Sequence, residues 1–214
     1  MTQRAAPVVL AAASGTGKTT LARRLVGDSD RYVFSVSATT RSPRAGEVDG
    51  VDYHFLDVGD FERRAEDGRL AEWASVHGCL YGTPRTEIDD AARRGEHVVL
   101  DIDVQGARQI RASIEDAVLI FVLPPSVDIM MARLKGRGTE GREDIARRLR
   151  SALTELQALK DFDYVVVNDD LDECISEIRA ITEGQGEVPV SPEQDAEQFR
   201  TEIVRILRDE YDQN

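Results

Sequence analysis

The sequence has few of the residues that would hold a metal scaffold or a disulfide framework. Its two cysteines, Cys79 and Cys174, lie far apart without a CxxC pair, and its three histidines do not cluster with them at metal-ligand spacing. A bound structural zinc is therefore not expected. Two free thiols are a simpler interpretation than a disulfide, which the spacing leaves open.

Long hydrophobic runs are also missing. The apolar stretches at 98–100 and 118–123 are far shorter than the roughly 20 residues that span a bilayer. The first seven residues lead directly into an apolar run and lack the architecture of a signal peptide. We therefore expect a cytoplasmic protein without a membrane partner.

Basic residues are fewer than acidic residues. The chain has 27 Lys and Arg against 40 Asp and Glu, a net charge of −13, which argues against a nucleic-acid-binding protein because that class displays a basic face. Residues 183–214 hold nine acidic residues and three arginines, so part of the acidity is local. The rest fits either a high-salt habitat or simple solubility.

What the chain does contain is typical of one globular domain of 214 residues, with 41% hydrophobic and 31% charged residues. Short runs that are apolar throughout alternate with helical patterns, which favours an α/β fold with a doubly wound parallel sheet. We expect its strands at 8–13, 33–36, 97–101, 117–123 and 163–167.

Between Ser37 and Gly50 the composition changes to Thr, Arg, Pro and Gly, which predicts an inserted lobe. Within it, 51–56, 70–76 and 80–83 are expected to be strands and 61–66 a short helix. Helices of the core are expected at 18–26, 84–94, 104–112, 126–134, 145–156 and 170–181. Ser126 is the predicted N-cap of the helix expected at 126–134, and Asp170 is the predicted N-cap of the helix expected at 170–181.

A final helix is indicated by Ser191-Pro192-Glu193-Gln194, which combines an N-cap, a proline at the first helical position and a glutamine two positions later. Its apolar stripe must pack against the body of this chain or against a second subunit, so a homodimer stays open. The stripe consists of Phe199, Ile203, Ile206, Leu207 and Tyr211.

The strongest chemical signal is Ala12-Ala13-Ser14-Gly15-Thr16-Gly17-Lys18-Thr19, a phosphate-binding loop with alanine in place of the first glycine. Its backbone N–H groups would wrap a nucleotide β-phosphate at the helix N-terminus, and Lys18 would bridge β and γ oxygens. The Thr19 hydroxyl would hold Mg2+, and Asp101, at the end of a buried strand, is a second candidate ligand. A glycine-rich turn without a ligand is the alternative, which the flanking strand and helix disfavour.

The predicted lobe contains Arg41 and Arg44, three residues apart beside proline and glycine. A guanidinium about 4 Å from a phosphate gains roughly 4 kcal/mol of gross Coulomb energy at an effective dielectric near 20. The pair therefore predicts a second anion site, with a solvated basic turn as the alternative.

From Val8 to about Thr182 the chain resembles the guanylate kinase family. The stretches that carry the resemblance are 14–20, 35–41 continuing to Glu47, 49–53, 72–74, 81–83, 100–107, 124–126, 133–139 and 167–170. Three positions depart from many relatives, which carry proline at Ala13, an aromatic residue at Leu80 and serine at Thr83. None of these changes removes a group that phosphoryl transfer needs, and we expect any consequence in base affinity.

The resemblance implies two nucleotide sites. The GMP site would comprise Ser37, Arg41, Arg44, Tyr53, Glu72, Tyr81, Thr83, Asp101 and Asp103. The ATP site would comprise Ser14, Gly15, Thr16, Gly17, Lys18, Thr19, Thr20, Arg133, Arg137 and Asn168. The catalytic residues would be Lys18, Arg41, Arg137 and Arg148, and Mg2+ would be held by Thr19 and Asp101, partly through water.

The resemblance further implies in-line transfer from MgATP to GMP, with dGMP as a second acceptor and no covalent enzyme intermediate. In that assignment a carboxylate at Glu72 accepts from N1–H and the 2-amino group of guanine, an edge that adenine does not offer. Two rivals are a related P-loop kinase with another phosphorylated acceptor, such as ribose bisphosphate, and a noncatalytic guanylate-kinase-like module that binds peptides. The guanine-binding set opposes the first, and the intact loop opposes the second.

The resemblance also divides the chain. A kinase domain at 1–182 would consist of a core at 7–36, 84–132 and 150–182, a GMP-binding insert at 37–83 and a mobile lid at 133–149. Residues 183–214 would form a linker and an acidic amphipathic helix.

Overall fold

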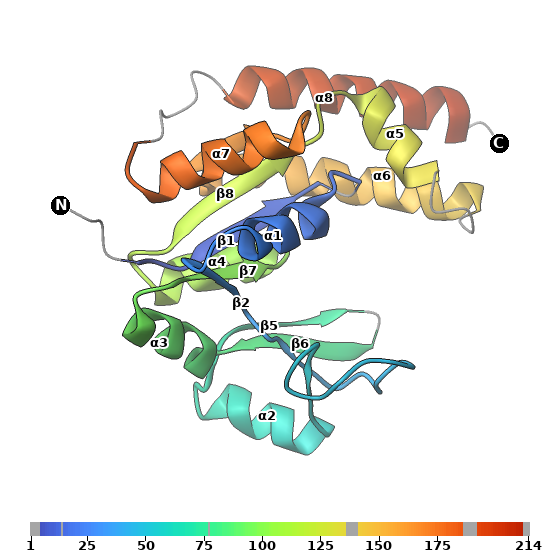
Figure 1. The fold of residues 1–214 in the computed structure, drawn as a ribbon. Coiled ribbons are helices and arrows are strands. Elements are labelled where there is room, and N and C mark those ends of the chain that lie inside the picture. The colour runs from blue at the N-terminus through green and yellow to red at the C-terminus, as the bar shows by residue number, and fades with distance from the viewer. Residues whose placement is uncertain (1–4, 14, 77, 136–140, 186–191, 212–214) are drawn as a thin grey trace. The chain divides into compact units, whose positions relative to one another are not determined.

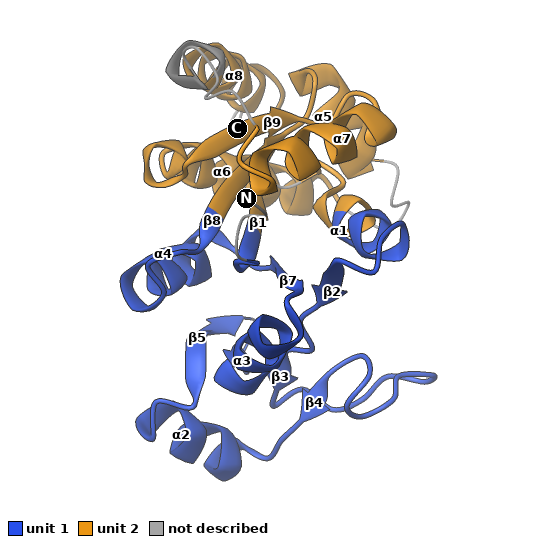
Figure 2. Cartoon of the chain, turned by 60° about the vertical axis from the view of Figure 1, so that its left-hand side comes forward, with its two compact units in different colours: residues 1–9, 22–118 blue, residues 10–21, 119–214 orange. Residues whose placement is uncertain are grey.

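The computed structural model describes residues 5–13, 15–76, 78–135, 141–185 and 192–211. The chain forms two compact units (Figure 2). Unit 1 contains residues 1–9 and 22–118, and unit 2 contains residues 10–21 and 119–214.

The larger sheet has five strands in the order β2-β7-β1-β8-β9. Its strands are β1 Val8–Ala12, β2 Tyr32–Phe34, β7 His97–Asp101, β8 Val118–Leu123 and β9 Tyr164–Val167. The pairs β2 with β7 and β8 with β9 are parallel, and β1, β7 and β8 are buried over most of their length. The predicted α/β class and its parallel sheet are confirmed, because strands covered on both faces must be apolar throughout.

A second sheet lies within unit 1, where the composition changes after Val36. Its strands are β3 Ala38–Thr39, β4 His54–Phe55, β5 Leu70–Val76 and β6 Cys79–Pro84, in the order β4-β3-β6-β5. β6 is antiparallel to both β3 and β5, whereas β3 and β4 are parallel. Phe61 of helix α2, Val58–Glu66, is fully buried with Ala38 and Leu70, so this sheet and helix share a small core (Figure 1).

One expected strand of the lobe, 51–56, is largely a turn. Only His54–Phe55 is extended, because residues 48–53 close on themselves. The Asp52 carboxylate accepts from the Val48 N–H at 2.8 Å, and the Gly50 N–H donates to the Tyr53 carbonyl at 2.8 Å. Aspartate and a glycine at φ 75° favour such a turn over an extended chain.

The remaining helices follow the predicted order. They are α1 Lys18–Gly27, α3 Arg85–Arg94, α4 Val104–Ser113, α5 Val127–Lys135, α6 Arg142–Leu156, α7 Leu171–Thr182 and α8 Pro192–Ile206, with short turns η1 Leu159–Asp161 and η2 Leu207–Tyr211. Two of the three predicted N-caps are confirmed, and the third, Ser191, lies outside the described residues. The Ser126 hydroxyl accepts from the Ile129 N–H at 3.2 Å, and Asp170 accepts from the Asp172 and Glu173 amides at 2.9 and 3.0 Å.

Helix α8 packs within unit 2, against α5, α6 and η1 (Figure 1). Ile203 is fully buried and Leu207 is 5% exposed. The sequence left open whether the body of this chain or a second subunit covers the apolar stripe. For Ile203 and Leu207, the body of this chain does.

Candidate active site

The predicted phosphate-binding loop joins β1 to α1 in unit 2. Gly15 and Gly17 have φ values of 91° and 85°, which side-chain-bearing residues rarely adopt. A Cβ at Gly17 would also lie 3.0 Å from Asn168 Nδ2. The first hydrogen bond of α1 runs from the Leu21 N–H to the Gly17 carbonyl. The backbone N–H groups that precede Leu21 are therefore directed outward at the N-terminal end of the helix. This is the arrangement that binds phosphate.

Two residues from distant elements brace the loop. The Thr16 carbonyl accepts from Asn168 Nδ2 at 2.7 Å and from Arg133 Nη1 at 2.8 Å, and Thr16 is 2% exposed. Arg133 also donates to the Asn168 carbonyl at 3.4 Å. Both residues were expected at the ATP site, and in the structure their side chains hold the loop backbone.

Two cavities adjoin the loop within unit 2. One, of about 210 Å³, is lined by loop residues, including Lys18 and Thr19, and by Arg148. The other, of about 530 Å³, is lined by Gly15, Gly17, Thr20, Arg133, Asn168, Asp169 and Leu171. The structure thus brings the described part of the expected ATP set together, whereas Ser14 and Arg137 lie outside the described residues.

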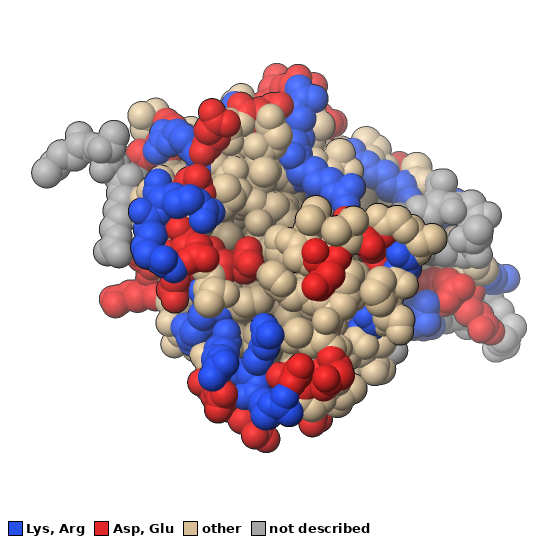
Figure 3. All heavy atoms as spheres, turned by 60° about the horizontal axis from the view of Figure 1, so that its bottom comes forward, with Lys and Arg blue, Asp and Glu red and all other residues tan. Residues whose placement is uncertain are grey.

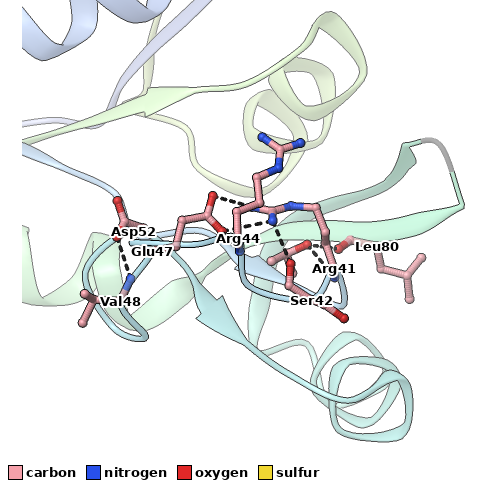
Figure 4. Close-up of polar contacts among 8 residues, drawn as sticks. Arg41, Ser42, Arg44, Glu47, Val48, Asp52 and Leu80 are labelled. Carbon is pink, nitrogen blue, oxygen red and sulfur yellow. Dashed lines mark hydrogen bonds and ion pairs between the residues drawn. The ribbon is translucent and has the colours of Figure 1, made fainter.

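In unit 1, Arg41 is held by a carboxylate that the sequence analysis gave no role (Figure 4). Its Nη2 and Nη1 donate to Glu47 Oε1 and Oε2 at 2.9 and 3.0 Å. Hydrogen bonding to Glu47 raises the pKa of Arg41 further above its ordinary value, and Arg41 lowers the pKa of Glu47. The Arg44 N–H also donates to Glu47 at 2.7 Å, while its guanidinium points away from the pair.

Two tyrosines of the expected set lie beside Arg41. The Arg41 guanidinium carbon is 5.2 Å from the ring centre of Tyr53, and the Tyr53 and Tyr81 rings meet edge to face at 6.1 Å. Tyr81 and Thr83 are two residues apart on β6, so their side chains share one face of the sheet. The four-stranded sheet therefore connects the surroundings of Arg41 to the residues expected to bind guanine.

Glu72 of β5 is a buried carboxylate on that sheet. It pairs with Thr83 across the ladder, accepts from the Thr83 hydroxyl at 2.7 Å and is 6% exposed. Burial, followed by the charge of Asp103, raises the pKa of Glu72 to about 7, although the Thr83 hydrogen bond works in the opposite direction. Asp103 itself caps α4 by accepting from the Gln105 and Gly106 amides.

Two further expected GMP residues occupy ends of elements in unit 1. Asp101 is the last residue of β7, and Ser37 precedes β3, where its carbonyl accepts from the His54 N–H at 2.9 Å. Both side chains are partly buried. The contact in this site that sequence analysis missed is the one between Glu47 and Arg41. An acid six residues after Arg41 in a glycine-containing turn was the available signal for Glu47.

The raised pKa of Glu72 predicts a stability that depends on pH. The group ionises near pH 4.5 in the unfolded chain and near 7 in the folded one, so its contribution is present below 4.5 and lost as pH rises through 7. A shift of that size corresponds to at most about 3 kcal/mol. Glu72→Gln should therefore raise the free energy of unfolding of the ligand-free protein by roughly 1–3 kcal/mol at pH 8.

Urea unfolding at pH 5 and pH 8 measures this effect. The difference between Glu72→Gln and the unchanged protein should shrink below about 1 kcal/mol at pH 5. Glu62→Gln, at an exposed position of α2, is the matched control and should show no such dependence. A stability difference that is the same at both pH values would contradict the burial of an ionisable carboxylate.

No helix among the described residues is long and apolar enough to cross a membrane. The described residues also contain no group of three or more His, Cys, Asp and Glu placed to hold a metal ion. The hydroxyl of Thr19 and the carboxylate of Asp101 are hard oxygen donors, the ligand type that suits Mg2+ beside a nucleotide phosphate.

In this α/β fold, the first strand, β1, is followed by a glycine-rich loop and the helix α1. This arrangement defines a P-loop nucleotide-binding protein. The model of the family described as Guanylate kinase matches residues 4–185. The chain belongs to the guanylate kinase family.

Relatives and solved structures agree. The chain is 53% identical over 173 residues to the guanylate kinase of Nitratidesulfovibrio vulgaris, covering 81% of this chain and 84% of the relative. It is 46% identical over 180 residues to that of Gluconobacter oxydans, covering 84% and 86%. The crystal structure of guanylate kinase from Anaplasma phagocytophilum superposes with a TM-score of 0.67 at 32% identity, covering 92% of this chain and 96% of that one.

Proposed function

We propose that this protein transfers the γ-phosphoryl group of ATP to GMP, releasing ADP and GDP, and accepts dGMP as a second substrate. The single observation that carries the proposal is the buried Glu72 carboxylate beside Thr83. Once ionised, it accepts from N1–H and the 2-amino group of guanine together. With AMP the same carboxylate would be desolvated and unpaired, which opposes adenine.

The acceptor phosphate is assigned to Arg41, Arg44, Tyr53 and Tyr81. Arg41 is already fixed by Glu47 and lies over the Tyr53 ring, so its guanidinium is ordered before the substrate arrives. Arg44, whose side chain is exposed, is the more adaptable of the two cations. Ser37, Asp103 and Asp101 complete the acceptor site in the proposal, the first two at the guanine base.

ATP is assigned to the loop of unit 2. Loop amides at the N-terminus of α1 would bind the β-phosphate, and Lys18 would neutralise charge that moves between the β and γ oxygens. Thr20, Arg133 and Asn168 line the larger cavity, which we assign to the nucleoside end of ATP. Arg148 lines the smaller one and is assigned with Arg137, of the proposed mobile lid, to the transferring phosphoryl group.

Thr19 and Asp101 are proposed to hold Mg2+, Thr19 through its hydroxyl and Asp101 partly through water. When bound, this ion would supply positive charge to the phosphate oxygens. The chain's own contribution is to orient the two nucleotides, exclude water and place Lys18 and the arginines where negative charge develops. No side chain needs to form a covalent bond to the substrate.

A panel of acceptors tests the proposal. With ATP and Mg2+, ADP release should depend on GMP and dGMP, and AMP, CMP, UMP and ribose 1,5-bisphosphate should be used at least roughly 10³-fold less well in kcat/KM. A preference for another acceptor would favour the related P-loop kinase instead. Nucleotide binding without any ADP release would favour a noncatalytic module.

The remaining assignments are parts of the same proposal. The protein would act in the cytoplasm on small nucleotides alone, without nucleic acid. On the face drawn in Figure 3, basic and acidic side chains are interspersed. The expected domain boundaries, with the kinase domain at 1–182, stay a prediction. Sedimentation would decide between a monomer and a homodimer.

A further inference from the structure

Strand β5 is the outer strand of the four-stranded sheet and has β6 as its neighbour in that sheet. Along an antiparallel pair, alternate residues direct their backbone N–H and C=O groups away from the partner strand. An outer strand therefore presents polar groups that need partners from another element. In unit 1, helix α4 supplies such partners.

Gln109 of α4 binds the main chain of Trp73 with both ends of its side-chain amide. Its Nε2 donates to the Trp73 carbonyl at 2.9 Å, and its Oε1 accepts from the Trp73 N–H at 3.1 Å. One turn further along α4, the Ser113 hydroxyl donates to the Ala71 carbonyl at 3.3 Å. The helix thus offers β5 the donor and acceptor that a neighbouring strand would offer.

Glu72 lies between the two residues of β5 that α4 binds. The register of β5 against β6 shifts between Leu70 and Glu72, and such an irregularity re-aims the side chain that follows. The carboxylate is packed against Gly106 of α4, where a Cβ would lie 2.7 Å from Glu72 Oε2. Gly106, Gln109 and Ser113 follow helical spacing, so one face of α4 contacts both the backbone and the carboxylate.

We infer that Gln109 is a positioning residue for guanine recognition, which holds Glu72 in place through its two hydrogen bonds to the main chain of Trp73. This inference rests on the proposed function, because it assigns Glu72 to the base. Removing the amide frees the outer strand beside Glu72, and the carboxylate then moves toward water. Guanine binding should become weaker and less selective, while ATP binding stays unchanged.

Gln109→Leu tests the inference through steady-state kinetics. Loss of two hydrogen bonds should raise KM for GMP roughly 10- to 30-fold, with kcat changed by less than about 3-fold. The ratio of kcat/KM for GMP to that for IMP should fall about tenfold, because IMP lacks the 2-amino group that Glu72 binds. The pH at which KM for GMP changes, near 7 in the unchanged protein, should move downward as the carboxylate becomes solvated.

Two variants and one substrate serve as controls. Gln109→Glu keeps the acceptor for the Trp73 N–H, but it turns a carboxylate oxygen toward the Trp73 carbonyl and adds negative charge on the helix face that packs against Glu72. KM for GMP should therefore rise at least as much as in the leucine variant, and Gln109→Glu carries the test if the leucine variant does not fold. Gln157→Leu makes the same change at an exposed position after α6 and should behave as the unchanged protein. KM for ATP should vary by less than about 2-fold throughout.

The inference is wrong if Gln109→Leu keeps the original KM for GMP and GMP-to-IMP ratio. It is also wrong if GMP and IMP are affected equally and KM for ATP rises with them, which would indicate a general structural role. If the unchanged protein transfers no phosphoryl group to GMP in the same assay, the proposed function fails instead. The two failures are thereby distinguished.

Discussion

Replacing Lys18 by alanine is expected to lower kcat for GMP phosphorylation by roughly 10³-fold, because the ammonium is the loop's only side-chain cation for the charge that moves between the β and γ oxygens. GMP affinity should stay within about 2-fold, since the residues assigned to GMP belong to unit 1. The glycine geometry and the Thr16 contacts that shape the loop do not use the Lys18 ammonium, so the fold should persist.

Coupled measurement of ADP release gives kcat, and calorimetric titration with GMP gives the affinity. Arg23→Ala, at an exposed position of the same helix, removes one cation and should leave both quantities unchanged. Retained turnover in Lys18→Ala would refute the assignment of this lysine. A parallel loss of GMP affinity would show that the substitution acts beyond the loop.

Replacing Glu72 by glutamine should lower kcat/KM for GMP by roughly 10²- to 10³-fold, with a similar effect on dGMP. The amide is isosteric and can still accept from the Thr83 hydroxyl. Its NH2 group is a donor that would face the N1–H and 2-amino donors of guanine, and the side chain carries no negative charge to attract them. With GMP saturating and ATP varied, KM for ATP should be unchanged, because the change lies in the acceptor site.

The same substitution should remove a pH dependence. Glu72 has a pKa of about 7, and guanine needs the ionised form, so KM for GMP in the unchanged protein should fall as pH rises from 6 to 8. In Glu72→Gln this dependence should disappear, whereas in Glu62→Gln it should persist. An unchanged pH profile in Glu72→Gln would mean that another group controls acceptor binding.

Much of the fold could be predicted because its signals are local. The buried strands are continuous apolar runs, and the caps at Ser126 and Asp170 depend on residues within one turn. The strand expected at 51–56 failed for a local reason too, since the Asp52 carboxylate and Gly50 stabilise a turn that competes with an apolar alternation. From sequence alone, the stability that a side-chain hydrogen bond to a nearby amide gives a turn is difficult to compare with the stability that an apolar alternation gives a strand.

The candidate site was predictable to a smaller extent. The loop from Gly15 to Thr19 is recognisable from contiguous residues, whereas Glu72 alone would pass for a residue at a strand edge and was identified through its resemblance to a family motif. The pairing of Arg41 with Glu47 was missed, although both lie in one short segment, because sequence spacing does not say which acid a guanidinium meets. The contacts of Arg133 and Asn168 with Thr16 were equally out of reach.

The order of strands and helices, the phosphate-binding turn and the acidic character of the chain follow from the amino acids alone, because backbone preferences and charge belong to neighbouring residues. Tertiary structure decided which groups are buried and what they bind. Asn168 meets Thr16 across 152 positions, and Gln109 meets Trp73 across 36. Hydrogen-bond partners and the dielectric around Glu72 come from residues that only folding brings together, and these determine its pKa and its place in the site.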